Sequence, residues 1–361
     1  MHFIQILVVK ETRDNEKRVA LTPREVALLA HKGYRILVET DAGLNSGFTN
    51  DEYIKAGAAI FVLTSSGFPA NTFIVRVLRP SKERELIENG LFHDNTAMLG
   101  FLFPFVADSH MATWQELGLT TLSFDLFKSI SIYDPKNAQA AMSRIAGRLA
   151  FLDALNLYKG EQPAKLTVIG TGAAGISAAK EARKHNIPVQ MFGRKESFRT
   201  ELERLGMTYH VIPNGANEIN FIRPHLADAT LMITAARVPG EKAPLLIDEV
   251  SLNALPANAV VIDLAASNGG NVFGTQCEQT VTVANNVSIR SISGYPKMEP
   301  RTSSEVYAQC AYSLITEIMS PEGNISFENE LVQEIWVTHD RHRHDSLYDT
   351  FDEFKICNMK L

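Results

Sequence analysis

The stretch "LTVIGTGAAGISAAKEARKHNIPVQMFGRKE", Leu166 to Glu196, decides how this chain folds. An apolar run leads into glycines spaced G-x-G-x-x-G, and a run with helical spacing follows. In such a strand–turn–helix the first glycine permits a tight turn, the second lets a pyrophosphate approach the backbone, and the third lets helix and strand pack closely. The pattern favours a dinucleotide site over a mere packing turn. The candidate contacts are Gly170, Thr171, Gly172, Ala173, Ala174 and Gly175.

The second strand of this stretch, "PVQMF", ends without the acidic residue that usually accepts hydrogen bonds from the adenosine ribose of NAD. Gly193, Arg194 and Lys195 stand there instead. Without a carboxylate the 2′-phosphate of NADP is not repelled, and Arg194 could pair with it. In the competing interpretation both cations are solvated loop charges and the cofactor site has weakened.

Two later segments are expected at the same edge of the sheet, where ligands of α/β proteins bind. "TAARVPG", Thr234 to Gly240, follows an apolar strand and is a candidate loop beside the nicotinamide, through Thr234, Ala235 and Ala236. Asp263 ends the strand "AVVIDLA". It either contacts the cofactor or caps the following turn, "AASNGGN".

On either side of this stretch, strand and helix patterns alternate from residue 3 to residue 125 and again from residue 165, which predicts βαβ units around parallel sheets. A long helix over 137–158 connects the two blocks. A helix over 302–320 is expected to return to the first. The sequence therefore predicts an α/β fold of two Rossmann-like domains, the first of them discontinuous. The expected boundaries are 1–137 with 296–361 for the first domain, and 138–295 for the second domain with its connecting helix.

Composition excludes several classes of function. The 361 residues are 45% hydrophobic and 21% charged, an ordinary globular balance, and the net charge of −6 argues against binding nucleic acid. Three distant cysteines form no disulfide framework, and the start of the chain does not look like a signal peptide, so a cytoplasmic protein is expected. His339, His342 and His344 lie in a polar tail that we interpret as solvated, and no metal site is predicted.

The segments "KETRDNEKRVALTP", "SRIAGRLA", "VIGTGAAG" and "TAARVPGEKAPLLIDEVSLNALPANAVVIDLAASNGGN" resemble the alanine dehydrogenase and proton-translocating transhydrogenase family, over nearly the whole chain. The tail from "GYPKMEP" to "VTHD" looks like the end of the soluble NAD(H)-binding domain in the transhydrogenase branch. This resemblance implies NAD(H) as cofactor and a homodimer. It also implies hydride exchange with an NADP(H)-binding domain on a membrane partner, which would hold the protein beside the inner membrane.

The alanine dehydrogenase branch needs a lysine and a histidine at the substrate and an aspartate near the nicotinamide. The matching positions here are Leu78, Phe103 and Ser267. An apolar side chain cannot transfer a proton, so the acid–base groups of that branch are missing. Arg18 remains where the family places an arginine that binds a carboxylate.

The transhydrogenase branch carries an Arg…Gln…Asp loop before the connecting helix. Its positions correspond here to Ile132, Asp134 and Asn137, while Ser143 is kept. The candidate catalytic residues are therefore Asp134, Asn137, Ser143 and Arg18. Three hypotheses stay open: a transhydrogenase-like protein, a free-standing NADP(H)-dependent oxidoreductase of a small keto or amino acid, and a non-catalytic binding protein.

Overall fold

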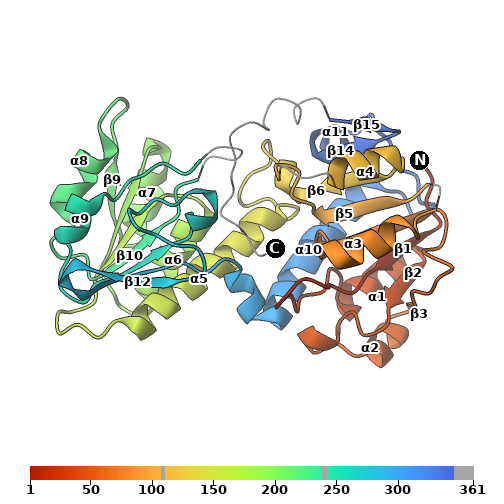
Figure 1. Cartoon of the computed structure of the whole chain (residues 1–361), viewed down its shortest axis with the longest axis horizontal. Coiled ribbons are helices and arrows are strands. Elements are labelled where there is room, and N and C mark those ends of the chain that lie inside the picture. Colours follow the sequence, from red (N-terminus) through yellow and green to blue (C-terminus); the bar gives the residue numbers. More distant parts are fainter. Residues whose placement is uncertain (94, 107–109, 238–241, 345–361) are drawn as a thin grey trace. The chain divides into compact units, whose positions relative to one another are not determined.

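The computed structural model describes residues 1–93, 95–106, 110–237 and 242–344, so a section of the predicted segment 296–361 lies outside the described residues. The chain forms two compact units (Figure 1). Of the described residues, unit 1 contains Met1–Met142 and 297–344, and unit 2 contains Ser143–Pro296. Helix α5 (Ala138–Leu157) begins in unit 1 and continues into unit 2.

Unit 1 is built on an eight-stranded sheet with the order β15-β14-β6-β5-β4-β1-β2-β3. Strands β1 to β6 run parallel, and β14 joins β6 antiparallel. The strands are β1 (Gln5–Val8), β2 (Ile36–Glu39), β3 (Ala59–Phe61), β4 (Thr72–Leu78), β5 (Ala97–Phe101), β6 (Thr120–Ser123), β14 (Trp336–His339) and β15 (His342–Arg343). The central strands β4 and β5 are buried on both faces, as parallel strands between helical layers are.

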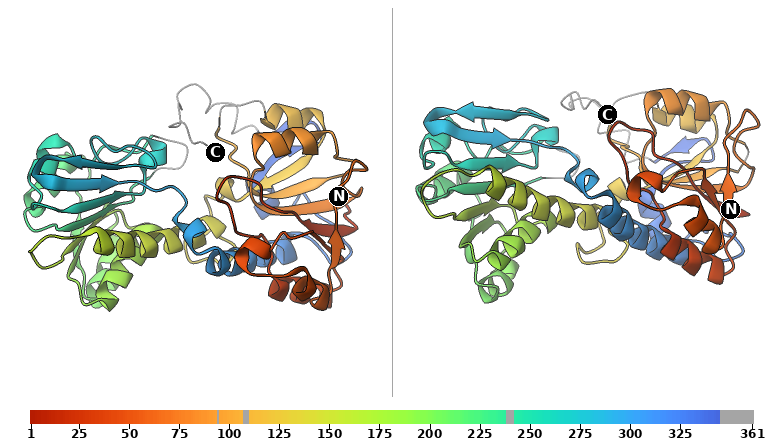
Figure 2. Two further views of the ribbon diagram at one scale, coloured as in Figure 1. Left: turned by 60° about the horizontal axis from the view of Figure 1, so that its bottom comes forward. Right: turned by 90° about the horizontal axis from the view of Figure 1, so that it is seen from below.

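The helices of unit 1 cover both faces of this sheet, with α3 and α4 on one face and α1 and α10 on the other (Figure 2). Local capping explains where several begin: α1 starts with a proline, α2 starts at a capping box of Thr49 and Glu52, and α3 starts at Ser81, whose side chain accepts a backbone N–H. The helices are α1 (Pro23–His31), α2 (Asn50–Lys55), α3 (Lys82–Asn89), α4 (His110–Glu116), α10 (Pro300–Ile318) and α11 (Glu330–Ile335).

Unit 2 is built on a seven-stranded sheet with the order β12-β13-β11-β10-β7-β8-β9, parallel except for β12. The strands are β7 (Leu166–Ile169), β8 (Val189–Gly193), β9 (Thr208–Val211), β10 (Leu231–Thr234), β11 (Val260–Asp263), β12 (Thr280–Val283) and β13 (Val287–Arg290). Its helices besides α5 are α6 (Ala173–Lys184), α7 (Arg199–Arg204), α8 (Glu218–Ile222) and α9 (Glu249–Asn253).

The six parallel strands of each sheet follow the same spatial order, 3-2-1-4-5-6 by their order along the chain. This is the order of a dinucleotide-binding fold, in which the switch between the first and fourth strands opens a crevice at their carboxyl ends. The prediction of an α/β fold with Rossmann-like sheets is confirmed. In unit 2 that switch lies between β7 and β10, and in unit 1 it lies between β1 and β4.

Candidate functional site

The glycine-rich turn of unit 2 lies between β7 and α6, at the switch point of the sheet. Gly170 adopts φ +114°, where a side chain would be strained, and a Cβ there would also lie 2.9 Å from the carbonyl oxygen of Ala235 on the neighbouring loop. A Cβ at Gly175 would lie 2.1 Å from the carbonyl oxygen of Gly170. Both positions are therefore restricted to glycine by close backbone packing.

Gly172 differs from these two glycines because it faces open space. A Cβ at this position would meet no heavy atom of the described residues within 4 Å. Gly172 is also the N-cap of the 12-residue helix α6, and within the described part of the chain no side chain caps this end. An uncapped helix N-terminus with free space in front of it fits a pyrophosphate group, which backbone N–H groups and the helix dipole attract.

The first turn of α6 is also held from behind, by α5. A Cβ at Gly147 of α5 would lie 1.9 Å from the carbonyl oxygen of Ala174, so only glycine allows this approach. Thr171, Ala173 and Ala174 keep some of their surface exposed at the turn. The candidates from Thr171 to Ala174 thus keep exposed surface at a turn that α5 packs against.

Asp263 lies on β11, beside Thr234 at the end of β10. Its buried carboxylate accepts hydrogen bonds from the Thr234 hydroxyl (3.1 Å) and from the backbone N–H groups of Ala265, Asn271 and Val272 (2.9, 2.9 and 3.2 Å). Burial raises the pKa of Asp263 above its ordinary value. Of the two interpretations from the sequence, capping of the turn is the one that these bonds support, because both oxygens already have donors.

Asn271 is a residue that sequence reasoning missed. Its fully buried amide accepts a hydrogen bond from the N–H of Ala236 (3.1 Å) and donates to the carbonyl oxygens of Ala236 and Pro244 (2.9 and 2.8 Å). It therefore joins Ala236 to Pro244, although one amide after two glycines gives no signal of this in the sequence. The end of the predicted Thr234–Gly240 loop, 238–240, lies outside the described residues.

Gly193 ends β8, at the position where NAD sites usually carry an acidic residue that binds the ribose. A Cβ there would lie 2.6 Å from Cγ2 of Thr171 and 2.7 Å from the hydroxyl oxygen of Tyr209. The Tyr209 hydroxyl is hydrogen-bonded to Thr171 and donates to the carbonyl oxygen of Lys195 (2.9 Å). Two neutral hydroxyl groups therefore fill the space that a carboxylate side chain would need.

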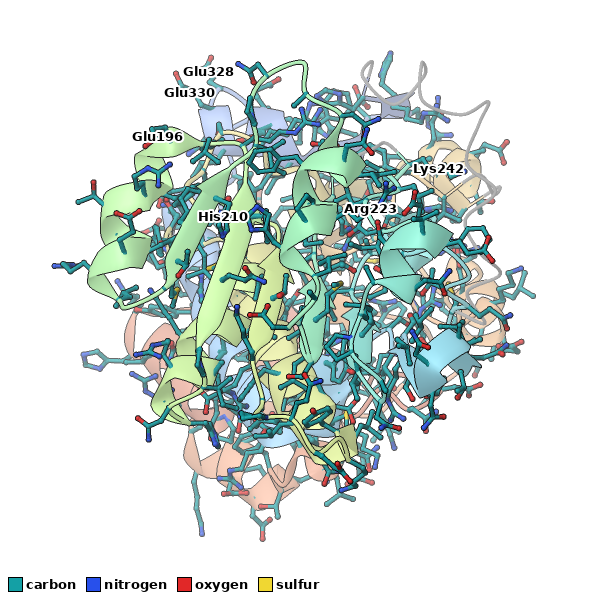
Figure 3. All side chains as sticks on the ribbon, turned by 90° about the vertical axis from the view of Figure 1, so that its left-hand side faces the viewer. Glu196, His210, Arg223, Lys242, Glu328 and Glu330 are labelled. Atoms are coloured by element: carbon teal, nitrogen blue, oxygen red, sulfur yellow. The ribbon has the colours of Figure 1, made fainter. Side chains whose placement is uncertain are left out.

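Strand β9 holds Tyr209 in this position. His210, labelled in Figure 3, is the next residue on β9, and its ring stacks on that of Phe192 with centroids 4.7 Å apart. Phe192 is fully buried in the core of unit 2. Burial also raises the pKa of Tyr209, so its hydroxyl stays protonated near neutral pH.

Arg194 is already paired. Its guanidinium donates to one carboxylate oxygen of Glu218 through Nε (2.9 Å) and lies 2.6 Å from it through Nη2. The side chain of Arg194 is 69% exposed and that of Glu218 is 19% exposed. The predicted free cation for a 2′-phosphate is therefore neutralised by a carboxylate, while Lys195 is exposed at the start of a short 3-10 helix.

Arg18 of unit 1 is buried and paired with Glu16 through both oxygens of its carboxylate, at 2.7 Å from Nε and 2.6 Å from Nη2. Its third nitrogen, Nη1, donates to the sulfur of Met142 at 3.4 Å. The guanidinium predicted to bind a substrate carboxylate thus already has a carboxylate two residues away in the sequence.

In the loop before α5, the side chains of Asp134 and Asn137 form hydrogen bonds with the nearby backbone. Asn137 accepts the N–H of Ala140 (2.9 Å) and donates to the carbonyl oxygen of Ser131 (3.1 Å), so it acts as an N-cap of α5. Asp134 accepts the N–H of Lys136 at 2.8 Å. Ser143 lies further along α5 and is partly exposed. A catalytic role for Asp134, Asn137 and Ser143 stays a prediction.

The three positions where alanine dehydrogenases place acid–base groups carry none here. Phe103 adopts φ +54° and lies under the guanidinium of Arg13, 5.3 Å from the ring centroid. Leu78 ends β4, and the hydroxyl of Ser267 donates to the side chain of Asn268 (3.1 Å). None of these three side chains supplies a proton donor or acceptor suited to imine chemistry.

Glu11 marks the switch point of the unit 1 sheet. One of its carboxylate oxygens accepts the N–H of Val77 (2.6 Å) and the other accepts that of Leu78 (3.2 Å), which ties the end of β1 to the end of β4. Burial, and then the negative charge of Glu16, raise the pKa of Glu11 to about 7. Glu11 therefore titrates near neutral pH in the folded protein.

This shift predicts a pH dependence of stability. The folded pKa lies above the ordinary value of 4.5, so the folded state holds the proton more tightly than the unfolded state does. The contribution is present in full below the ordinary value and is lost as pH rises through about 7. Wild type should therefore lose unfolding free energy relative to Glu11→Gln between about pH 5 and about pH 8. Parallel urea curves at each pH measure this difference, and a constant difference would contradict the assignment.

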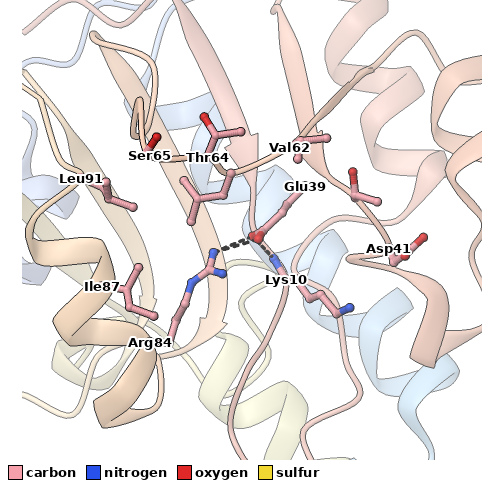
Figure 4. A pocket seen from close by; sticks show the side chains of 11 residues that line it. Lys10, Glu39, Asp41, Val62, Thr64, Ser65, Arg84, Ile87 and Leu91 are labelled. Atoms are coloured by element: carbon pink, nitrogen blue, oxygen red, sulfur yellow. Dashed lines mark hydrogen bonds and ion pairs between the residues drawn. The ribbon is translucent and has the colours of Figure 1, made fainter.

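A second concavity lies in unit 1, beyond the ends of β1, β2 and β3 (Figure 4). This pocket of about 640 Å³ is lined by charged residues and by apolar residues such as Val62 and Ile87. Its principal carboxylate, Glu39, is already bound by the guanidinium of Arg84 (2.9 Å) and by the backbone N–H of Lys10 (2.8 Å). The glycine turn, with its uncapped helix end, is the better-supported site.

Within the described ranges, no cluster of histidine, cysteine and carboxylate residues could hold a metal ion. Of the three histidines in the expected solvated tail, His342 is exposed and His339 and His344 are half-buried, so the segment is not a free tail. It forms β14 and β15, and the ring of His339 stacks on Phe327 with centroids 3.7 Å apart.

Among the helices of the described residues, none combines the length and apolar character needed to cross a membrane.

Two family models match the chain, one for each of two consecutive ranges of residues. The N-terminal domain of alanine dehydrogenase/PNT matches residues 7–146, and the C-terminal domain matches residues 147–344. The chain belongs to the alanine dehydrogenase/PNT family. The resemblance of the sequence motifs is thereby confirmed.

Relatives from both branches of the alanine dehydrogenase/PNT family are similar to this member. An NAD(P) transhydrogenase alpha-subunit chain of Rickettsia prowazekii is 25% identical over 93% of this chain and 95% of its own length. Alanine dehydrogenase of Bacillus subtilis is 29% identical over 82% and 80%. The structure of transhydrogenase from Sinorhizobium meliloti superposes with a TM-score of 0.82 at 25% identity, covering 94% of this chain and 99% of that one. An L-alanine dehydrogenase structure has a TM-score of 0.81 at 22% identity, covering 96% and 98%, which shows a shared fold.

Proposed function

We propose that this chain binds a nicotinamide dinucleotide at the Gly170–Gly175 turn and presents it for hydride transfer to a partner domain, as the soluble alpha subunit of an NAD(P) transhydrogenase. The partner is a membrane-bound subunit that carries NADP(H). The chain would act as a homodimer in the cytoplasm, held at the membrane by that subunit.

The observation that carries the proposal is the fit of the turn to a pyrophosphate. Gly172 leaves open space at the uncapped end of α6, and the carboxyl ends of β7 and β10 meet there at the switch point. When bound, the dinucleotide supplies the hydride chemistry. The chain supplies backbone N–H groups that hold the phosphates, and Asn271 holds Ala236 beside Gly170 of the turn.

The transhydrogenase branch fits better than the alanine dehydrogenase branch because of the groups available in unit 1. Hydride exchange between two nicotinamides needs orientation and no protein acid or base. Leu78 and Phe103 offer none, and Arg18 has its charge neutralised by Glu16. The relatives in the transhydrogenase branch also cover more of the chain than those in the other branch, 92–93% against 73–83%.

Nucleotide binding is tested first, by titrating the purified chain with NADH and with NADPH and following the fluorescence of the nucleotide. Saturable binding of at least one is the expected result. If neither binds, both the proposed function and a free-standing oxidoreductase are excluded, and the non-catalytic hypothesis is left.

Hydride transfer is tested next, with membranes that contain a transhydrogenase membrane subunit and its NADP(H)-binding domain. Reduction of an NAD⁺ analogue by NADPH should require both the chain and the membranes. Oxidation of NADH by the chain alone, in the presence of pyruvate and ammonium, would instead establish the alanine dehydrogenase activity. Light scattering of the purified chain tests the homodimer.

A further inference from the structure

An ion pair lies next to Gly193, the position at which the ribose of a bound dinucleotide is expected. The family resemblance gives no role to this pair. Arg194 follows directly after β8, where a cation is well placed to meet the 2′-phosphate of NADP. Glu218 comes from a separate element, the start of α8, and holds that guanidinium by two nitrogens at 2.9 and 2.6 Å. Arg194 is therefore already paired with a carboxylate before any ligand binds.

We infer that Glu218 is a specificity-determining residue that selects NAD(H) over NADP(H) through its ion pair with Arg194. This inference rests on the proposed function. A 2′-phosphate that pairs with Arg194 would either displace the Glu218 carboxylate or bind the remaining N–H groups of the guanidinium. In both cases it would remain close to the negative charge of Glu218. The 2′-hydroxyl of NAD(H) does not meet this obstacle.

The surroundings of Gly193 support this choice. The hydroxyls of Thr171 and Tyr209 fill the place of the usual carboxylate, so the β8 edge itself is neutral. A neutral edge neither repels a phosphate nor rewards one, since hydroxyl groups can bond to either kind of ribose. Discrimination between the two nucleotides then falls to the pair formed by Arg194 and Glu218.

The test is the affinity of four proteins for NADH and NADPH, measured by nucleotide fluorescence: wild type, Glu218→Gln, Arg194→Ala with Glu218→Gln, and Glu203→Gln. Wild type should bind NADH more tightly than NADPH. Glu218→Gln should raise the affinity for NADPH by about tenfold, the scale of one charge-assisted hydrogen bond, and leave that for NADH unchanged. Adding Arg194→Ala should remove the gain.

Glu203→Gln is the matched control, because it removes the same charge from an exposed ion pair of unit 2, with Arg199 at 3.0 Å. Its ratio of affinities should equal that of wild type. An unchanged ratio in Glu218→Gln would overturn the inference, as would a gain that survives Arg194→Ala, since Lys195 would then hold the phosphate. If wild type binds neither nucleotide, the proposed function itself fails. If it binds NADH and Glu218→Gln changes nothing, only the inference on Glu218 fails.

Discussion

Replacing Gly172 by alanine should weaken NADH binding by about a hundredfold, because charge-assisted hydrogen bonds of roughly 1.5–3 kcal/mol each between the pyrophosphate and the backbone would be lost. The added methyl group would occupy the open space at the end of α6, where the phosphate must approach. Fluorescence titration of the variant against wild type measures the loss.

The same variant should remain folded, which separates a binding defect from a folding defect. Gly172 has φ −77° and ψ 179°, a conformation open to any residue, and its Cβ would meet no described atom within 4 Å. The change at a helix N-cap costs about 1 kcal/mol or less. Unaltered NADH affinity in a folded Gly172→Ala protein would refute the assignment of this turn as a phosphate site.

Two further glycine variants bracket the result. Gly90→Ala, at the end of α3 in unit 1, adds its methyl group 3.7 Å from the nearest atom and should change neither binding nor stability. Gly175→Ala adds it 2.1 Å from the carbonyl oxygen of Gly170, so helix and strand must separate and unit 2 should lose stability. The effect of Gly172→Ala should resemble neither.

Replacing Glu88 by glutamine should lower the unfolding free energy of unit 1 by about 3–5 kcal/mol, the usual cost of leaving a buried charge without its partner. Glu88 is 1% exposed, and its carboxylate accepts two hydrogen bonds from Arg76, at 3.0 and 2.8 Å, and one from Arg84, at 2.7 Å. Arg76 is itself only 2% exposed, so water cannot solvate its guanidinium once the charge of Glu88 is removed.

Tryptophan fluorescence is a selective readout for this prediction. The chain contains two tryptophans, Trp114 and Trp336, and both belong to unit 1. Urea unfolding followed by their emission therefore reports the transition of unit 1. Glu305→Gln is the control within the same unit, since its pair with Arg301 spans 3.5 Å and is exposed, and should change stability by less than about 1 kcal/mol. Equal midpoints for the two variants would contradict a stabilising role for the buried pair.

The sheets and the glycine turn were predictable because their signals are local. Apolar strands alternating with capped helices, and glycines with a fixed spacing, depend on residues that are neighbours in the chain. The strand β14 was not predictable in the same way. Four residues, Trp336–His339, carry little pattern, and their partner β6 lies more than 200 residues earlier.

In the candidate site too, local patterns were predictable from the sequence and contacts between distant residues were not. That Gly193 lacks a carboxylate is visible in the sequence, but the groups beside it are not, because Thr171 and Tyr209 come from a turn and from another strand. The pairing of Arg194 with Glu218 likewise joins residues 24 positions apart. The sequence therefore indicated a free cation at a place where the folded chain has a neutral ion pair.

The pairing of β14 with β6 also has a consequence for synthesis on the ribosome. Trp336 and Thr338 pair with Leu122 and Thr121, so the sheet of unit 1 is completed only after residues 336–339 have emerged. Unit 2 is continuous from Ser143 to Pro296 and can fold earlier. Until then β6 is an unprotected sheet edge, the kind of surface on which nascent chains aggregate and which chaperones shield. A nascent chain halted before Trp336 should therefore carry a folded unit 2 beside a first sheet that is still open.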